Sequence, residues 1–212
     1  LTVMDRNCTD KFIPAKNLSW AGKKPSDFAR KNIIVTESVK DETILSQMPE
    51  ANGAAIVINP KNGDVLAMIG DFFDRPNGFN RAVSAKRQLG SAVKPFVYIT
   101  ALENGFTPSS ILVDEDLKLS DEWQPRNASR DFLGSVTLRV ALERSRNVPT
   151  VRVSEIVGIS KIIKRFSDFG LNTEGLDYDL STTLGSFNTT PERVAKAYSV
   201  FVNNDKKVET NY

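Results

Sequence analysis

Residues 87–98 constrain this chain more than any other segment, because a polar, turn-rich stretch changes there into an apolar stretch with helical spacing. The apolar positions after Gly90 recur at helical intervals and stop at Asn104-Gly105, a favourable helix C-terminus. Ser91 therefore lies at or just before the N-terminus of a predicted helix. Pro95 falls in its first turn, where the missing N–H costs nothing.

The same segment contains the only Ser-x-x-Lys of the chain, Ser91 to Lys94. Residues three apart share a helix face, so Lys94 can bring its amine to the Ser91 hydroxyl. A serine becomes nucleophilic when a base takes its proton, and the usual base, histidine, is absent from all 212 residues. Burial and the positive end of the helix dipole both favour a neutral lysine. The pattern predicts a serine nucleophile with a lysine base; the alternative is an N-cap serine beside a solvated lysine.

Composition limits the other function classes. With 40% hydrophobic and 25% charged residues, the chain is typical of a soluble globular protein with one domain plus a fragment, or two small domains. A net charge of +2, with scattered basic residues, argues against nucleic-acid binding. The single Cys8 excludes an internal disulfide and a cysteine metal site, and the lack of histidine argues against zinc, so we expect no metal and no cofactor.

The first half of the chain predicts two modules. Residues 1–50 alternate short apolar clusters with Lys, Asp and Pro, which indicates short strands and loops of a small β module followed by a connector at 41–50. Residues 54–58 and 65–69 form a predicted hairpin, because Asn-Gly and Pro lie between them. Their unbroken apolar character predicts strands covered on both faces, with helices on at least one side. Residues 71–86 are predicted to be a surface loop.

The second half is predicted to be mainly helical after a long irregular region at 106–134. Trp123, with Pro125 and Asn127 nearby, is a candidate for lining a cleft; the alternative is an aromatic residue that fixes the loop. Helical spacing at 136–142 breaks at Ser145-Arg146-Asn147, which we place at a helix end or in the following turn. That turn could point Ser145 and Asn147 into a cleft. Further helices are predicted at 150–157, at 160–169 and after Pro191, with Thr190 as the cap.

Taken in order, these motifs resemble the transpeptidase domain of class A penicillin-binding proteins. The matching residues are Arg87, Gln88, Gly90, Ser91, Lys94, Pro95 and Phe96, then Ser145 and Asn147, and then Leu184-Gly185 followed by Thr190-Pro191 and Ala197-Tyr198 with Phe201. The hairpin at 54–69 also matches. Residues 1–50 are similar to the end of the small β-barrel-like, OB-like module that precedes this domain in one branch of the family.

The resemblance implies an α+β fold, an antiparallel sheet flanked by helices as in β-lactamases, over residues 51–212 without its C-terminal strands. It implies a D,D-transpeptidase that cross-links peptidoglycan stem peptides through a Ser91 acyl-enzyme and is acylated by β-lactams. Lys94 would be the base, Ser145 a proton relay, and Asn147 the group that holds Lys94 and the substrate amide. Gly90 and Trp123 are the candidate substrate-binding residues.

Two departures from the family pattern stand out. Leu89 replaces a usual proline, and the third motif, Lys-Thr-Gly, is missing. The nearest string, Lys61-Asn62-Gly63, precedes the nucleophile and has no hydroxyl, so we reject it. We expect the motif on a strand beyond Tyr212 in a longer protein. The alternatives are a β-lactamase or D,D-carboxypeptidase, in which water deacylates Ser91, and a non-catalytic penicillin-binding scaffold.

The resemblance also implies where the parent protein works. We expect an extracytoplasmic location at the periplasmic face of the bacterial inner membrane, a membrane anchor outside this chain, and a glycosyltransferase domain elsewhere in the protein. The chain itself opens Leu1-Thr2-Val3-Met4-Asp5, without a signal peptide or a membrane-spanning apolar run, and is expected to be a piece of something longer.

Overall fold

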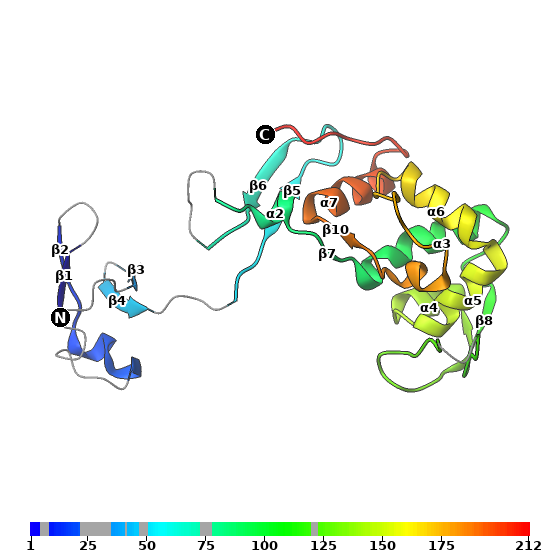
Figure 1. Cartoon of the computed structure of the whole chain (residues 1–212), viewed down its shortest axis with the longest axis horizontal. Coiled ribbons are helices and arrows are strands. Elements are labelled where there is room, and N and C mark those ends of the chain that lie inside the picture. Colours follow the sequence, from blue (N-terminus) through cyan, green and yellow to red (C-terminus); the bar gives the residue numbers. More distant parts are fainter. Residues whose placement is uncertain (5–8, 22–34, 41, 47–50, 73–77, 120–122) are drawn as a thin grey trace. The chain divides into compact units, whose positions relative to one another are not determined.

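The structure is a computed structural model that describes residues 1–4, 9–21, 35–40, 42–46, 51–72, 78–119 and 123–212 (Figure 1). The chain forms two compact units, Leu1–Asn52 and Gly53–Tyr212. No helix in the described ranges is both long and apolar enough to cross a bilayer. Cys8 and the apolar pair at 33–34 lie outside the described residues.

The first unit is built from two antiparallel hairpins. Strand β1 (Thr2–Met4) pairs with β2 (Asp10–Phe12), and β3 (Val35–Val39) pairs with β4 (Glu42–Ser46). Two 3-10 turns, Ala15–Asn17 and Ser19–Ala21, lie between the hairpins in the sequence. The short strands agree with the predicted β character of this unit; its assignment to the end of an OB-like module stays a prediction.

Two details of the first unit differ from the prediction. The apolar cluster at 18–21 belongs to a 3-10 turn, where Leu18 is buried with Ile13 and Leu45 and Trp20 donates to the Leu45 carbonyl at 3.1 Å. The predicted connector contains β4, because Thr43 and Ile44 are β-branched and Leu45 reaches the small core. In both segments, packing against the small core determines the secondary structure and overrides the local sequence preference.

In the second unit, β5 (Ala55–Ile58) and β6 (Val65–Ile69) form the predicted hairpin, with Ala55 opposite Ile69. The predicted burial on both faces is wrong for the described residues. Helix α7 (Pro191–Ser199) packs against β5, and the short helix α2 (Arg81–Ser84) packs against β6. However, Val57, Leu66 and Ile69 stay more than half exposed. Helix α2 also corrects the prediction of an unbroken loop at 71–86; Asn80 caps it, and Ala82 is buried.

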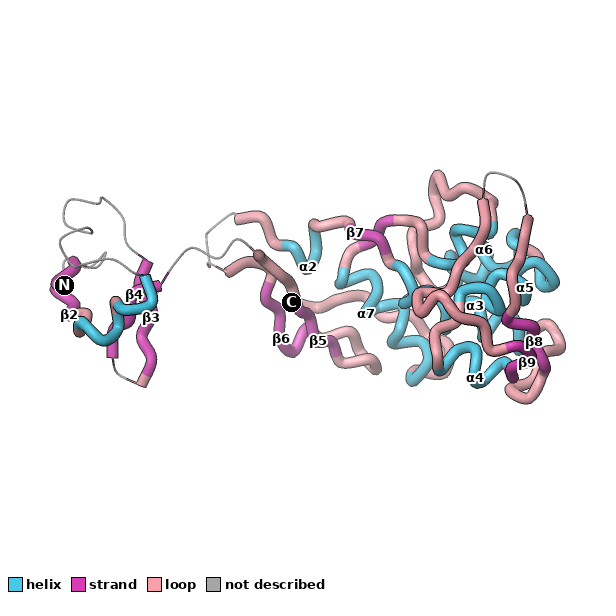
Figure 2. Tube along the Cα trace, turned by 90° about the horizontal axis from the view of Figure 1, so that it is seen from below, coloured by secondary structure: helices cyan, strands magenta, loops and turns pink. Residues whose placement is uncertain are grey.

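The rest of the second unit is a helical body. Helix α3 (Lys94–Glu103) contacts α4 (Leu138–Glu143), α5 (Asn147–Val157) and α6 (Ile159–Asp168), as Figures 1 and 2 show. The remaining elements are short: the antiparallel pairs β8 (Ile111–Asp114) with β9 (Gly134–Thr137) and β7 (Arg87–Gln88) with β10 (Asn188–Thr189), and 3-10 turns at Gly90–Val93, Leu180–Leu184 and Val200–Val202.

The core of this body fixes α3 in place. Phe96 is completely buried, and its ring lies 5.1–5.2 Å from the rings of Phe169, Tyr198 and Phe201. Burying a side chain of this size contributes on the order of 2 kcal/mol. The apolar face of α3 is therefore anchored, and Lys94, two residues before Phe96, is carried by a rigid helix.

The α4 region differs from the prediction in its first residues. Val136 and Thr137 belong to β9 and pair with β8, which lies inside the region predicted to be irregular. Strand β8 is only four residues long, and its alternating burial places Leu112 and Asp114 inside. Helix α4 begins after Thr137, whose side chain caps it by accepting from the Val140 N–H at 3.2 Å. The predicted helix after Pro191 and its Thr190 cap are confirmed.

Candidate active site

Ser91 lies in the 3-10 turn that leads directly into α3. Backbone hydrogen bonds hold this turn on one side, from Leu89 N–H to the Phe187 carbonyl and from Gly90 N–H to the Gly185 carbonyl, each 3.0 Å. The Tyr198 hydroxyl donates to the Ala92 carbonyl at 2.8 Å. The prediction that Ser91 sits just before a helix is confirmed, and its side chain is exposed.

Ser145 occupies the left-handed position at the end of α4, with φ of +50°. The Ser145 N–H donates to the Leu142 carbonyl and the Arg146 N–H to the Ala141 carbonyl, both at 2.9 Å, which is the Schellman pattern. Glycine is the usual residue at this position because a Cβ there is strained. A serine in this conformation carries strain, which the surrounding backbone hydrogen bonds hold in place.

Asn147 is the first residue of α5, and its surroundings come from the loop before β9. The Asn127 side chain accepts from the N–H groups of Asn147 and Val148, at 2.8 and 3.2 Å. Pro149 has no N–H, so this remote side chain satisfies the free donors of the first turn. The Asn147 amide donates to the Arg126 carbonyl at 2.8 Å. The Asn147 side chain is thereby oriented with its oxygen free for another partner.

That partner is Lys94. Its amine lies 2.7 Å from Asn147 Oδ1, 2.6 Å from the Ser145 carbonyl and 3.1 Å from Ser145 Oγ. Lys94 is 1% exposed, so the structure brings it together with Ser145 and Asn147 in a buried contact. Among the described contacts, Lys94 has no hydrogen bond to Ser91.

Burial, and to a smaller extent the positive charge of Arg146, together lower the pKa of Lys94 to about 8. Its partners also suit the neutral amine. The Ser145 carbonyl and Asn147 Oδ1 can only accept, so they take the two hydrogens of a neutral amine. The lone pair is then left for the third neighbour, Ser145 Oγ, which can donate. The geometry suits a lysine that exchanges a proton with the Ser145 hydroxyl.

Ser91, Ser145 and Asn147 open on one cavity of about 210 Å³. The other lining residues are Asn127, Ala128, Ser129, Arg144 and Arg146. Trp123 is half-buried and is not among the lining residues, and neither is Gly90, whose φ of +57° serves the turn before Ser91. Asn127, named beside Trp123 in the sequence analysis, does line the cavity.

No role was predicted for Arg146 or Asp114 from the sequence. Arg146 is the middle residue of the Ser-x-Asn triplet, and an arginine at that position does not by itself indicate a function. Asp114 stood at the end of an unrecognised strand. Lys61-Asn62-Gly63 lies in the turn between β5 and β6 and lines neither cavity.

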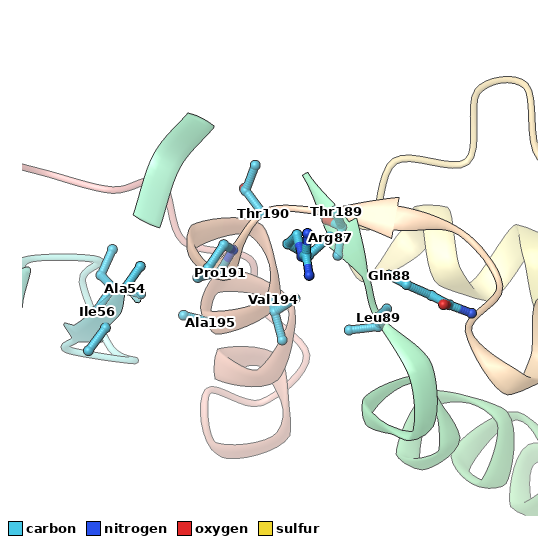
Figure 3. A pocket seen from close by; sticks show the side chains of 11 residues that line it. Ala54, Ile56, Arg87, Gln88, Leu89, Thr189, Thr190, Pro191, Val194 and Ala195 are labelled. Atoms are coloured by element: carbon cyan, nitrogen blue, oxygen red, sulfur yellow. The ribbon is translucent and has the colours of Figure 1, made fainter. Parts of the chain in front are cut away.

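A larger hollow of about 440 Å³ lies between β5, β7 and α7 (Figure 3). Its walls are mainly apolar and include Ile56, Leu89, Pro191, Val194 and Ala195. None of the four predicted catalytic residues lines it. Three of the four, Ser91, Ser145 and Asn147, line the smaller cavity instead, and the Lys94 amine contacts the last two.

The family model of the penicillin binding protein transpeptidase domain matches residues 53–212. This match covers most of the chain, and the chain therefore belongs to the penicillin-binding protein transpeptidase family. Penicillin-binding protein 1A from Rickettsia conorii is 40% identical over 209 residues, covering 94% of this chain and 26% of that protein. The corresponding protein from Escherichia coli K12 is 37% identical over 175 residues, covering 80% and 21%.

Solved structures agree with this placement. The crystal structure of penicillin-binding protein 1A from Haemophilus influenzae superposes with a TM-score of 0.79 at 30% identity, covering 94% of this chain and 30% of that one. PonA1 from Mycobacterium tuberculosis gives a TM-score of 0.63 at 25% identity over 70% of this chain and 42% of that one. The predicted α+β fold class and the predicted family are confirmed. The chain spans about a quarter of the length of the curated relatives.

Proposed function

We propose that the full-length protein cross-links peptidoglycan stem peptides by acyl transfer through Ser91. The Ser91 hydroxyl attacks the carbonyl between the two terminal D-alanines, and neutral Lys94 receives its proton. The C–N bond then breaks, and the departing D-alanine takes a proton through Ser145. The amine of a second stem peptide attacks the resulting ester and releases Ser91. Asn147 holds Lys94 and the substrate amide, and the Ser91 N–H is one donor to the oxyanion.

One observation carries this proposal: a buried lysine amine contacts Ser145 and Asn147 behind a cavity on which Ser91 opens. A lysine with a pKa near 8 is neutral in about a tenth of molecules at pH 7, enough for a base that acts near neutrality. The contact of the amine with Ser145 supports the relay role of that hydroxyl. Family membership supports the substrate class.

The setting of the reaction is part of the same proposal. The relatives are named penicillin-binding protein 1A, and their greater length leaves room for a glycosyltransferase domain and a membrane anchor outside this chain. The full-length protein would then act at the periplasmic face of the inner membrane. β-Lactams would acylate Ser91 as substrate mimics. A third motif with a Lys-Thr-Gly or similar sequence would follow on a later strand and supply the second oxyanion donor.

The test is covalent labelling of the full-length protein with a fluorescent penicillin. We expect a stable adduct on Ser91, located by peptide mass, and no adduct in Ser91→Ala. Ser135→Ala changes an exposed serine on β9 and should label as the parent does. Labelling that persists in Ser91→Ala would overturn the assignment of the nucleophile.

The same experiment distinguishes a transpeptidase from a hydrolytic enzyme. A β-lactamase or carboxypeptidase needs a base that activates water against the ester, and no Asp or Glu is among the described residues that line the cavity. We therefore expect the penicilloyl adduct to persist. Rapid release of hydrolysed penicillin would identify the protein as a hydrolase, and a complete lack of adduct would identify a non-catalytic scaffold.

A further inference from the structure

Arg146, which lies between Ser145 and Asn147 in the chain, is 5% exposed, and its guanidinium makes four hydrogen bonds. Its Nε donates to Asp114 Oδ2 at 2.7 Å. One terminal nitrogen donates to Ser129 Oγ and Asp131 Oδ1, both at 2.7 Å, and the other to the Asp131 carbonyl at 2.6 Å. The guanidinium therefore joins the α4–α5 turn to β8 and to the loop that precedes β9.

Asp114 is completely buried and connects Arg146 to the surroundings of Asn147. Its Oδ1 accepts from the Asn127 amide at 2.7 Å, and its Oδ2 also accepts from the Leu133 N–H at 3.2 Å. Asn127 in turn holds the Asn147 N–H. A closed path thus runs from Arg146 through Asp114 and Asn127 to Asn147.

Stability alone is a weak reason for this arrangement. A buried ion pair roughly offsets its own desolvation cost, and an apolar replacement of similar volume is often as stable. The Schellman hydrogen bonds already close the end of α4 with backbone groups only. The additional effect of Arg146 is to fix the 126–131 loop, which holds Asn147 through the Arg126 carbonyl and the Asn127 side chain.

We propose that Arg146 is a positioning residue for acyl transfer, whose guanidinium fixes Asn147 against the Lys94 amine. This inference rests on the proposed function and deepens it. The guanidinium and the amine carry like charge, and burial of both weakens the screening of their repulsion by water.

Other groups around the amine could also influence its titration. Apart from Arg146, the titratable or charged residues on α3, α4, α5, β8 and the 123–133 loop, with Arg144 after α4 and Tyr198 on α7, are Tyr98, Glu103, Asp114, Arg126, Arg130, Asp131, Arg139, Glu143, Arg144, Arg152, Glu155 and Tyr198. Arg146 is the charged group that lowers the pKa of Lys94. A variant that removes only the arginine would leave the buried Asp114 carboxylate without its guanidinium partner. A variant that neutralises both partners avoids this problem and tests the charge alone.

The experiment measures the rate of Ser91 acylation by fluorescent penicillin in the full-length protein between about pH 6 and 10. This range extends from below the lowered pKa of Lys94 toward the pKa of an ordinary lysine. The first variant is Arg146→Lys, which keeps the positive charge but loses the forked set of N–H donors of the guanidinium. The second is the double variant Arg146→Gln with Asp114→Asn, which removes both charges. Arg165→Gln is the matched control, because it removes an arginine whose fork binds Glu103 on the surface.

In Arg146→Lys, we expect the alkaline plateau of the rate to fall about tenfold or more, since one ammonium cannot span the acceptors of the fork. The midpoint of the pH profile should stay near that of the parent. In the double variant, the midpoint should move to higher pH, and the rate at pH 7 should fall about tenfold for each pH unit of that movement. Arg165→Gln should match the parent in both quantities.

Melting temperatures establish that each protein is folded under the assay conditions. Should Arg146→Lys unfold, the double variant, in which neither partner of the buried ion pair is charged, carries the test alone. A folded double variant with the plateau and midpoint of the parent would overturn the inference and leave the proposed function intact. A parent protein that is not acylated at Ser91 would overturn the proposed function itself.

Discussion

The side-chain oxygen of Asn147 lies 2.7 Å from the amine of Lys94, although 53 positions separate the two residues in the chain. This contact joins the first residue of α5 to the first residue of α3. Two helix N-termini therefore meet at the amine, and the position of each depends on the other.

Asn147→Ala removes an acceptor from the Lys94 amine and the donor to the Arg126 carbonyl. We expect acylation of Ser91 to slow by about 100-fold, because small misplacements of a catalytic group carry costs of that size. Stopped-flow measurement with fluorescent penicillin checks the rate. Asn172→Ala, at an exposed asparagine, is the control and should keep the parent's rate. An undiminished rate in Asn147→Ala would remove Asn147 from the mechanism.

Lys94→Met should change how stability depends on pH. The folded-state pKa of Lys94 is about 8, below the ordinary lysine value, so the cost of burying the ammonium is fully present below about pH 8. As pH rises above 8, the folded protein loses this proton before the unfolded chain does, and the parent gains stability until the unfolded chain titrates too. The total gain is up to about 3 kcal/mol.

Urea unfolding of the parent and Lys94→Met at several pH values measures this difference directly. The lost hydrogen bonds lower the free energy of unfolding of the variant by the same amount at every pH. The informative quantity is therefore how the difference in this free energy between the two proteins changes with pH. Lys161→Met, at an exposed lysine, should run parallel to the parent. Parallel curves for Lys94→Met would mean that the amine titrates normally.

Ser145→Gly should separate stability from activity. The residue has φ of +50°, so glycine relieves strain and should raise the free energy of unfolding by about 0.5–1 kcal/mol. Loss of the hydroxyl should slow acylation about 100-fold, the lower range for a proton-transfer group. Asn204→Gly is the control, because Asn204 also has φ of +50° at an exposed position; it should keep the parent's acylation rate. Full activity of Ser145→Gly would exclude the relay role.

Gly185→Ala should disturb the turn that carries Ser91. A Cβ on Gly185 would lie 2.2 Å from the Gly90 carbonyl oxygen and 2.5 Å from the Gly90 nitrogen, and neither backbone atom can move aside alone. We expect a loss of about 2–4 kcal/mol from the positive φ and the overlap together, with slower acylation.

Gly175→Ala is the matched control for this prediction. Its φ of +72° is similar to the +79° of Gly185, but a Cβ there meets nothing within 4 Å. It should lose only the conformational part, about 1–2 kcal/mol, and keep the parent's acylation rate. Equal losses in the two variants would show that the contact with Gly90 is unimportant.

The sequence predicted the parts of this site that depend on local spacing. Ser91 before a helix, the break at Ser145 to Asn147 and the Thr190 cap all follow from residue types within a few positions of one another. The family followed from the order of these motifs. Strand β8 was missed because four residues with two buried positions give too short a signal.

The long-range contacts of the site could not be read from the sequence. Asn127 caps α5 from 20 residues away, and Arg146 reaches Asp114 32 residues before it. No periodic pattern in the sequence indicates either contact, because each depends on how a loop folds back onto a helix. The expected burial of β5 and β6 failed for a related reason: an apolar strand predicts that a partner covers it but does not say which segment does so.

Helix α4 is only six residues long, and its last backbone hydrogen bonds are the ones that set Ser145 in place. Each residue of an α-helix adds a rotation of about 100° and a rise of about 1.5 Å. One inserted or deleted residue in α4 would therefore swing the serine hydroxyl away from the lysine, even if every motif residue were retained. The spacing between Thr137 and Ser145 should thus tolerate changes of residue type far better than changes of length.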